Sequence, residues 1–246
     1  MEVSLDYLGA IRDNAAALVD AAEAAGLDAR VPSCPDWTVG DLLAHMGEVH
    51  RWAAANCERA PGGPRQRAKE LGVESAPDPA ARPKWVRDGA DALLRVLERS
   101  PETPAWTWLP PATVGFWRRR QAHETAVHRV DAQLAAGRPE PIDGPLAADG
   151  VDEWLSLVPN LPQVMQKLTG SGETVHLHCT DVDGEWLIRL EPTGMELERA
   201  HAKGDVAARG TASDLQLWLM GRLPVERLEV FGDAGLLERW RDRVKF

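Results

Sequence analysis

A segment rich in proline and glycine near residue 140 divides the chain into two halves with different hydrophobic patterns. Residues 137–145 read Gly-Arg-Pro-Glu-Pro-Ile-Asp-Gly-Pro, a composition typical of a linker between domains. Before this segment apolar residues recur at helical spacing, whereas after it short stretches have the composition and alternation of strands. The 246 residues suit two domains. We therefore predict an α+β multidomain protein with domains at residues 1–140 and 141–246.

The N-terminal half has the pattern of a four-helix bundle. We expect helices at residues 5–25, 39–57, 85–98 and 113–136, an extended segment at 31–37, and a loop at 59–83 with one helical turn near 67–71. Gly26 ends the first helix, and Thr38 with Asp41 predicts a capping box at the start of the second. Four helices of comparable length favour a bundle.

The C-terminal half predicts a mainly antiparallel sheet accompanied by helices. We expect strands at residues 173–179, 185–190, 195–199, 206–209 and 228–231, and helices at 146–157, 211–219 and 233–241. The Asp183-Gly184 pair between the first two strands is a strong hairpin signal. Thr211 and Asp233 are the expected caps of the last two helices.

Charge and cysteine content exclude several classes of protein. With 28 basic and 38 acidic residues the net charge is −10, which disfavours nucleic-acid and membrane partners. The three cysteines form no C-x-x-C pair, so we expect reduced thiols and neither a disulfide framework nor a thiolate zinc site. The sequence has neither a signal-peptide pattern nor a membrane-spanning stretch. We expect a cytoplasmic protein that is a monomer or a homodimer.

The predicted fourth helix carries a candidate metal-binding pair. At about 100° per residue, Glu124 and His128 lie about 40° apart on one helix face, whereas His123 points about 140° away from His128. The spacing differs from H-E-x-x-H, which excludes a zinc protease of that type. A third ligand has to come from another helix. The second helix offers His45 and His50, and periodicity does not decide between them; a surface hydrogen bond between Glu124 and His128 is the alternative to a metal site.

Two segments resemble the mycothiol-dependent maleylpyruvate isomerase family. They are Val31 to His45, which reads VPSCPDWTVGDLLAH, and Arg119 to Asp131, which reads RRQAHETAVHRVD. The stretches Asp149–Trp154, Gly210–Arg222 and Val230–Asp233 extend the resemblance over nearly the whole chain. It implies a DinB-like metal-binding bundle followed by a C-terminal domain related to sterol carrier proteins.

The resemblance also implies a metal centre and an activity. In that family one histidine of the second helix and a Glu and His of the fourth hold the metal, and these correspond to His45, Glu124 and His128 here. His45 is thereby selected over His50. The implied cofactor is Zn²⁺ or another divalent metal with open coordination positions, and mycothiol is the implied co-substrate. The implied function is a mycothiol-dependent isomerase or thiol S-transferase that acts on an electrophilic small molecule.

Further residues concern substrate binding and ligand orientation. Substrate carboxylates would need cations, for which Arg120 and, across the domain cleft, Arg222 are the candidates, with Arg209 as the runner-up. Each of these arginines is otherwise a surface or salt-bridge residue. Asp131, one turn beyond His128, is either an orienting partner of a metal ligand or an exposed carboxylate.

A carrier without catalytic activity is the competing hypothesis. It predicts a structural metal with no open position and an apolar small molecule bound in a C-terminal cavity. The residues expected to line that cavity are Trp186, Ile188, Leu215, Trp218 and Leu219.

Overall fold

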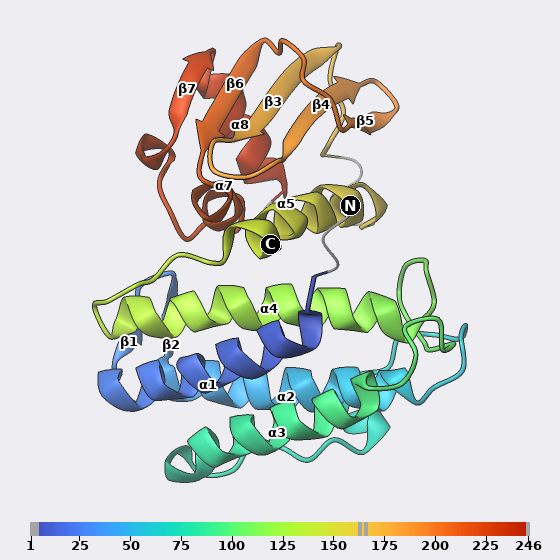
Figure 1. The fold of residues 1–246 in the computed structure, drawn as a ribbon, viewed down its shortest axis with the longest axis vertical. Coiled ribbons are helices and arrows are strands. Elements are labelled where there is room, and N and C mark those ends of the chain that lie inside the picture. The colour runs from blue at the N-terminus through green and yellow to red at the C-terminus, as the bar shows by residue number, and fades with distance from the viewer. Residues whose placement is uncertain (1–4, 162–163, 165–166, 245–246) are drawn as a thin grey trace. The chain divides into compact units, whose positions relative to one another are not determined.

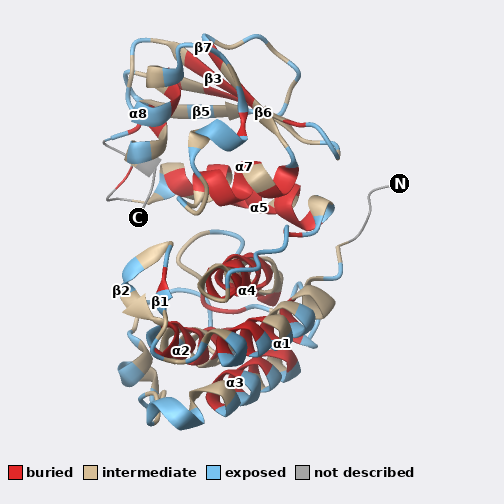
Figure 2. Cartoon of the chain, turned by 90° about the vertical axis from the view of Figure 1, so that its left-hand side faces the viewer, coloured by how far each residue is buried: buried red, intermediate tan, exposed pale blue. Residues whose placement is uncertain are grey.

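The chain separates into two compact units, residues 1–140 and 141–246, in a computed structural model that describes residues 5–161, 164 and 167–244. The first unit contains α1 (Tyr7–Ala25), β1 (Arg30–Val31), β2 (Cys34–Thr38), α2 (Val39–Cys57), α3 (Arg82–Leu97) and α4 (Val114–Ala135), with short 3-10 turns at Ala68–Leu71 and Pro79–Ala81. The four helices pack side by side with their buried faces turned toward one another, which confirms the predicted helical N-terminal domain (Figures 1 and 2).

Local capping determines where the bundle helices begin and end. The Thr38 side chain accepts a hydrogen bond from the Asp41 amide at 3.1 Å, and Asp41 accepts one from the Thr38 amide at 3.0 Å, so the predicted capping box of α2 is confirmed. Gly26, with φ 85°, ends α1 as predicted. Helix α3 begins at Arg82, three residues before the predicted start, because Pro83 is tolerated in the first helical turn.

A short hairpin connects α1 to α2. Strands β1 and β2 pair antiparallel, with Arg30 opposite Thr38 and Val31 opposite Cys34. The sequence predicts this segment only as extended, since pairing between two such short strands leaves no periodic signal. The hairpin matters for the site because it carries Ser33 and Trp37 toward the ends of α2 and α4, as the contacts described below show.

The second unit combines helices with a five-stranded sheet, which confirms the predicted α+β architecture. Its elements are α5 (Gly144–Leu157), a 3-10 turn at Val158–Asn160, β3 (Glu173–Cys179), β4 (Glu185–Glu191), β5 (Gly194–Glu198), β6 (Val206–Gly210), α7 (Ala212–Leu219), a 3-10 turn at Val225–Arg227, β7 (Glu229–Gly232) and α8 (Ala234–Val244). The strand order is β5-β4-β3-β6-β7, and only the β3–β6 pair is parallel. The sheet is therefore mixed but mainly antiparallel.

The two faces of this sheet differ in character. Val175 and Leu177 of β3 are fully buried on the face that receives the helices, and α8 packs against β6 (Figure 2). His176 and His178 alternate with them and therefore point to the opposite face. That second face carries polar side chains from several strands. Among the described residues, no helix is long and apolar enough to cross a membrane.

Candidate metal centre

Three side chains from two helices converge within the bundle. His45 projects from α2, while Glu124 and His128 lie on successive turns of α4. His45 Nε2 is 3.7 Å from Glu124 Oε1, and His128 Nε2 is 3.4 Å from the same oxygen. The two imidazole rings meet edge to face, with their centroids 5.0 Å apart. One carboxylate oxygen therefore faces both imidazole nitrogens.

This spacing fits a divalent metal ion. The three donor atoms of His45, Glu124 and His128 all lie within 4.8 Å of one another. Donor atoms bonded at about 2.1 Å to a tetrahedral ion lie about 3.4 Å apart, so small side-chain movements suffice to bind one. Two imidazoles and a carboxylate are a ligand set that zinc and neighbouring transition metals accept.

The four histidines of the first unit differ in burial and in the side chains that they contact. His50 is fully buried, and its Nε2 lies 3.1 Å from the Thr125 hydroxyl. Burial lowers the pKa of His50 to about 4, which keeps its ring neutral in the core. His123 is also buried and meets the ring of Tyr7 edge-on, 6.2 Å between centroids. His45 is thus the helix-two histidine beside Glu124, the choice that periodicity left open.

Asp131 contacts the ring nitrogen of His128 that is not directed at Glu124. The His128 Nδ1–H donates to Asp131 Oδ2 at 2.7 Å, and the Ser33 hydroxyl donates to the other carboxylate oxygen at 2.5 Å. Asp131 is fully buried, so the alternative of an exposed carboxylate is excluded, while its role in orienting a metal ligand stays a prediction that the contact with His128 supports. With Nδ1 bonded to Asp131, Nε2 is the ring nitrogen that faces Glu124 and the one that can offer a lone pair to a metal ion once it has lost its proton.

Trp37 covers the two imidazoles from the hairpin. Its ring centroid is 4.9 Å from that of His45 and 6.3 Å from that of His128, nearly parallel to the latter with an interplanar angle of 22°. An indole face packed on both rings restricts their rotation. Sequence reasoning did not assign Trp37 a place at the site, although it directly precedes the helix cap at Thr38.

Arg120 contacts the ligand carboxylate. One turn before Glu124, its guanidinium donates to Glu124 Oε2 at 2.9 Å, and its side chain is only 13% exposed. This contact leaves Glu124 Oε1 facing the histidines. Arg120 therefore positions a donor atom, while its role in binding a substrate carboxylate stays a prediction.

The electrostatics of the group favour an ionised Glu124. Burial alone would raise the pKa of this carboxyl, but hydrogen bonds with His128 and His45 and the charge of Arg120 hold it well below its usual range. Burial would also lower the pKa of His128, yet its bonds to Asp131 and Glu124 raise it to about 9. A metal ion bound here has to displace the proton that His128 otherwise carries at neutral pH.

The other predicted substrate residues belong to the second unit. Arg222 follows α7, and its guanidinium donates to the Met220 carbonyl at 2.6 Å. Arg209 lies on β6, opposite His178 of β3 in the parallel register. Their part in substrate binding stays a prediction. The side chains that the carrier hypothesis assigns to a cavity are all buried in this unit: Trp186, Ile188, Leu215, Trp218 and Leu219.

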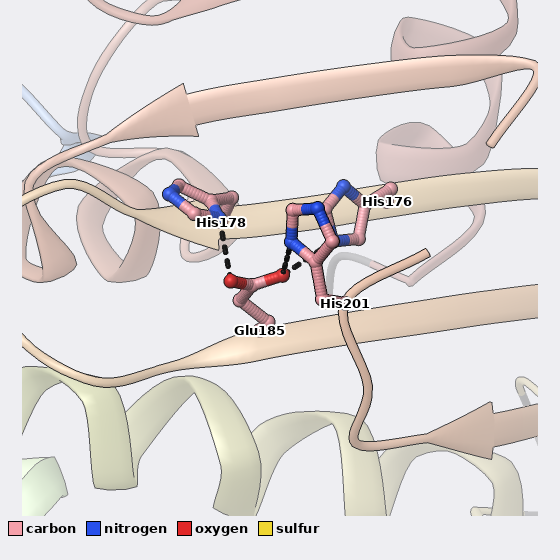
Figure 3. A group of neighbouring side chains, drawn as sticks. All are labelled: His176, His178, Glu185 and His201. Carbon is pink, nitrogen blue, oxygen red and sulfur yellow. Dashed lines mark hydrogen bonds and ion pairs between the residues drawn. The ribbon is translucent and has the colours of Figure 1, made fainter. Parts of the chain in front are cut away.

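The second unit holds a further group of ligand-type side chains that sequence reasoning missed. His176 and His178 of β3 and Glu185 of β4 point toward one another, and His201, from the segment after β5, approaches the same carboxylate (Figure 3). The nitrogen-to-oxygen distances to Glu185 are 3.3 Å for His176, 3.0 Å for His178 and 2.6 Å for His201. The signal in the sequence is His-x-His within a predicted strand, which puts both rings on one face.

Comparison with known families matches both units. Residues 8–133 match the family described as the mycothiol maleylpyruvate isomerase N-terminal domain. Residues 145–239 match the C-terminal domain of the same family, MDMPI. The two matched ranges contain every donor of the bundle group and every donor of the group on the sheet. No curated protein matches the chain.

Two solved structures share the fold over most of their length. The crystal structure of the mycothiol-dependent maleylpyruvate isomerase has a TM-score of 0.63 and 14% identity, and the alignment covers 92% of this chain and 91% of that one. A histidine-to-alanine mutant of that isomerase gives a TM-score of 0.62 and 15% identity with the same coverage. At this identity the likeness extends to the fold and the order of its domains.

Proposed function

We propose that this chain, which belongs to the mycothiol maleylpyruvate isomerase family, is an enzyme that joins a small thiol to an electrophilic small molecule with one divalent metal ion. The thiol is mycothiol and the metal is zinc. The observation that carries the proposal is the convergence of His45, Glu124 and His128 on a common point, with one oxygen of Glu124 facing both rings. The proposed localisation is the cytoplasm.

The donor set supports a catalytic role. Zinc commonly takes four ligands, and a site with three protein donors leaves room for a substrate atom. When bound, such an ion lowers the pKa of a thiol that coordinates it, so that the thiol reacts as a thiolate at neutral pH. The side chains of His45 and Glu124 are 33% and 27% exposed, which gives small molecules access to the donors.

The chain's own residues orient and confine the reaction. Asp131 holds the proton on His128 Nδ1, Arg120 fixes the rotation of the Glu124 carboxylate, and Trp37 packs on the two imidazoles. These contacts keep the donors in place before any ligand arrives, which reduces the cost of binding. A carboxylate of the substrate is bound by an arginine, for which Arg120 and Arg222 remain the proposed candidates.

Two outcomes of the thiol chemistry are open to the same donors. In isomerisation, the sulfur adds to one carbon of a cis double bond, rotation occurs about the resulting single bond, and elimination of the same thiol leaves the trans product. In S-transfer, the new carbon–sulfur bond is kept. The first outcome returns the thiol unchanged, while the second consumes one thiol for each electrophile.

The test combines metal analysis with turnover. Protein purified without chelator and without a polyhistidine tag is assayed with maleyl and epoxide compounds, with and without mycothiol. We expect turnover in the parent that requires the thiol, and its loss together with one metal equivalent in His45→Ala and Glu124→Gln. The control is Glu48→Gln, which changes an exposed carboxylate of the same helix, α2. We expect this variant to keep both the turnover and the metal.

Two results would count against the enzyme. Full metal content in His45→Ala and Glu124→Gln would remove the proposed centre. Metal loss in these variants without any thiol-dependent turnover in the parent, across the panel of electrophiles, would favour the carrier hypothesis instead.

A further inference from the structure

We propose that the C-terminal unit binds a divalent transition-metal ion of its own, of the zinc type, through four side chains: His176, His178, Glu185 and His201. These residues belong to the sheet and the segment that follows β5, so the site is separate in sequence and in donors from the one on α2 and α4. The inference does not depend on the proposed enzymatic function.

The four donors already surround a common point. Their ligand atoms all lie within 4.8 Å of one another, close to the spacing of about 3.4 Å that four donors on one tetrahedral ion require. The three ring centroids are nearly equidistant, at 6.1 Å for His176–His178, 5.9 Å for His176–His201 and 6.2 Å for His178–His201. The Glu185 carboxylate contacts all three rings (Figure 3).

The sheet fixes three of the donors. His176 and His178 are two residues apart on β3, and Glu185 stands directly opposite His178 on the antiparallel neighbour β4. Directly opposite residues in such a pair have their Cβ atoms about 5 Å apart, within reach of a shared ligand. Register alone therefore brings two imidazoles and a carboxylate together on one face of the sheet.

The fourth donor comes from a segment that is attached at both ends. His201 lies between Arg199, which forms an ion pair with Asp152 of α5, and Asp205, whose carboxylate accepts hydrogen bonds from the Thr174 amide and hydroxyl at 2.8 Å each. These contacts place the segment beside β3 without any metal. The side chain of His201 is 82% exposed, so it is the donor whose freedom a bound ion would reduce most.

The donor types select the class of metal. Three imidazoles and one carboxylate suit zinc, copper, nickel or cobalt, whereas magnesium and calcium prefer oxygen ligands throughout. A hollow of roughly 700 Å³ opens on this face and includes the three histidines in its lining, which gives an ion access from solvent. The alternative is that the three histidines only hydrogen-bond to the Glu185 carboxylate. In that case the sheet binds no stoichiometric metal ion.

Zinc titration of the full, tag-free chain tests the proposal. After removal of metal by chelator, we expect two zinc equivalents in the parent and one in the double variant His45→Ala/Glu124→Gln. In that double-variant background, adding His201→Ala is expected to weaken the remaining site at least 10-fold, and adding His178→Ala to abolish it. Because His201 is exposed, its replacement should leave the fold intact, and Lys203→Ala in the same segment is the matched control.

Cobalt provides a readout that is independent of affinity. In the His45→Ala/Glu124→Gln background, Co²⁺ should give the intense visible absorption of a four-coordinate ion, and His178→Ala should remove it. Zinc should also slow amide hydrogen exchange in residues 199–205. The proposal is overturned if this background binds no zinc at a concentration of about 100 μM, or if His201→Ala binds zinc as tightly as Lys203→Ala does. Loss of the bundle site alone leaves these results unchanged, so the two sites are tested separately.

Discussion

Replacing Asp131 by asparagine tests the physical argument for the bundle site most directly. Asp131 accepts the Nδ1–H of the proposed ligand His128 at 2.7 Å, and it is fully buried. Asparagine has the same size and keeps a hydrogen-bond acceptor but removes the charge. The variant therefore separates the electrostatic support of His128 from the packing around it.

The magnitude follows from the electrostatics of the ring. The pKa of His128 is about 9, against an ordinary value of 6.5. That difference corresponds to about 3 kcal/mol of net stabilisation of the positive ring, which remains after the bonds to Asp131 and Glu124 have outweighed the opposing effect of burial. If the two carboxylates contribute equally, Asp131 supplies at least about 1.5 kcal/mol. A metal ion on Nε2 also makes the ring more positive, so we expect Asp131→Asn to weaken zinc binding by about 10- to 30-fold.

The assay isolates the bundle site. Zinc affinity is measured by competition with a chromophoric chelator at pH 7.5, in the full chain carrying His178→Ala and His201→Ala so that the sheet donors do not contribute. Asp41→Asn makes the same chemical change at an exposed carboxylate of α2 and serves as the control. Circular dichroism before and after zinc addition checks that each variant is folded.

A change of less than 2-fold in Asp131→Asn, alongside complete loss of zinc binding in Glu124→Gln, would show that the charge of Asp131 does not support the site. It would mean that packing of His128 under Trp37, and not the buried charge, holds the ring in its productive orientation. A loss of zinc affinity as large as that of Glu124→Gln would also contradict the expected 10- to 30-fold weakening, because Asp131 would then act as a ligand itself.

Three further predictions concern stability. Because the pKa of His128 is about 9, its stabilising effect on the metal-free protein is present below pH 6.5 and is lost as the pH rises from 6.5 to 9. Because the pKa of His50 is about 4, stability is lost as the pH falls from 6.5 to 4. Urea unfolding at a series of pH values should therefore give a maximal free energy of unfolding near pH 6.5 and a loss of up to about 3 kcal/mol on each side. Thr38→Ala should lower the free energy of unfolding by about 1 kcal/mol through the lost helix cap, with zinc affinity unchanged within 2-fold by the same competition assay. Gly47→Ala should destabilise the bundle by about 1–3 kcal/mol in thermal unfolding, because a Cβ there would lie 2.0 Å from the indole of Trp85, and an unchanged melting temperature would contradict this packing.

The helices were predictable because their signals are local. A cap such as Thr38 with Asp41, or a stop such as Gly26, acts within four residues and needs no knowledge of the rest of the chain. The predicted start of α3, at residue 85, was three residues late, because Pro83 is compatible with a first helical turn as well as with a loop. The parallel pairing of β3 with β6 was not predictable, because two intervening strands lie between them in sequence and no local pattern specifies which strands pair.

The same distinction explains what the sequence revealed about the two groups of ligands. In each, one pair is local: Glu124 and His128 are four residues apart on a helix, and His176 and His178 are two residues apart on a strand. The remaining donors arrive through packing of α2 on α4 or through strand register, which periodicity does not encode. That is why the resemblance, and not the spacing, distinguished His45 from His50 in the bundle.

On the sheet no resemblance pointed to the donors, and the His-x-His pair of the predicted strand became a candidate site only once its strand partners were known. Glu185 is seven residues beyond His178 in sequence, yet the Asp183-Gly184 turn folds β4 back so that the two face each other. A carboxylate one position away, such as one at Trp186, would point to the core instead. A local histidine pair therefore becomes a candidate metal site only when a hairpin register brings a carboxylate to the same face, and this condition can be applied to a sequence whenever a strong turn signal fixes the register.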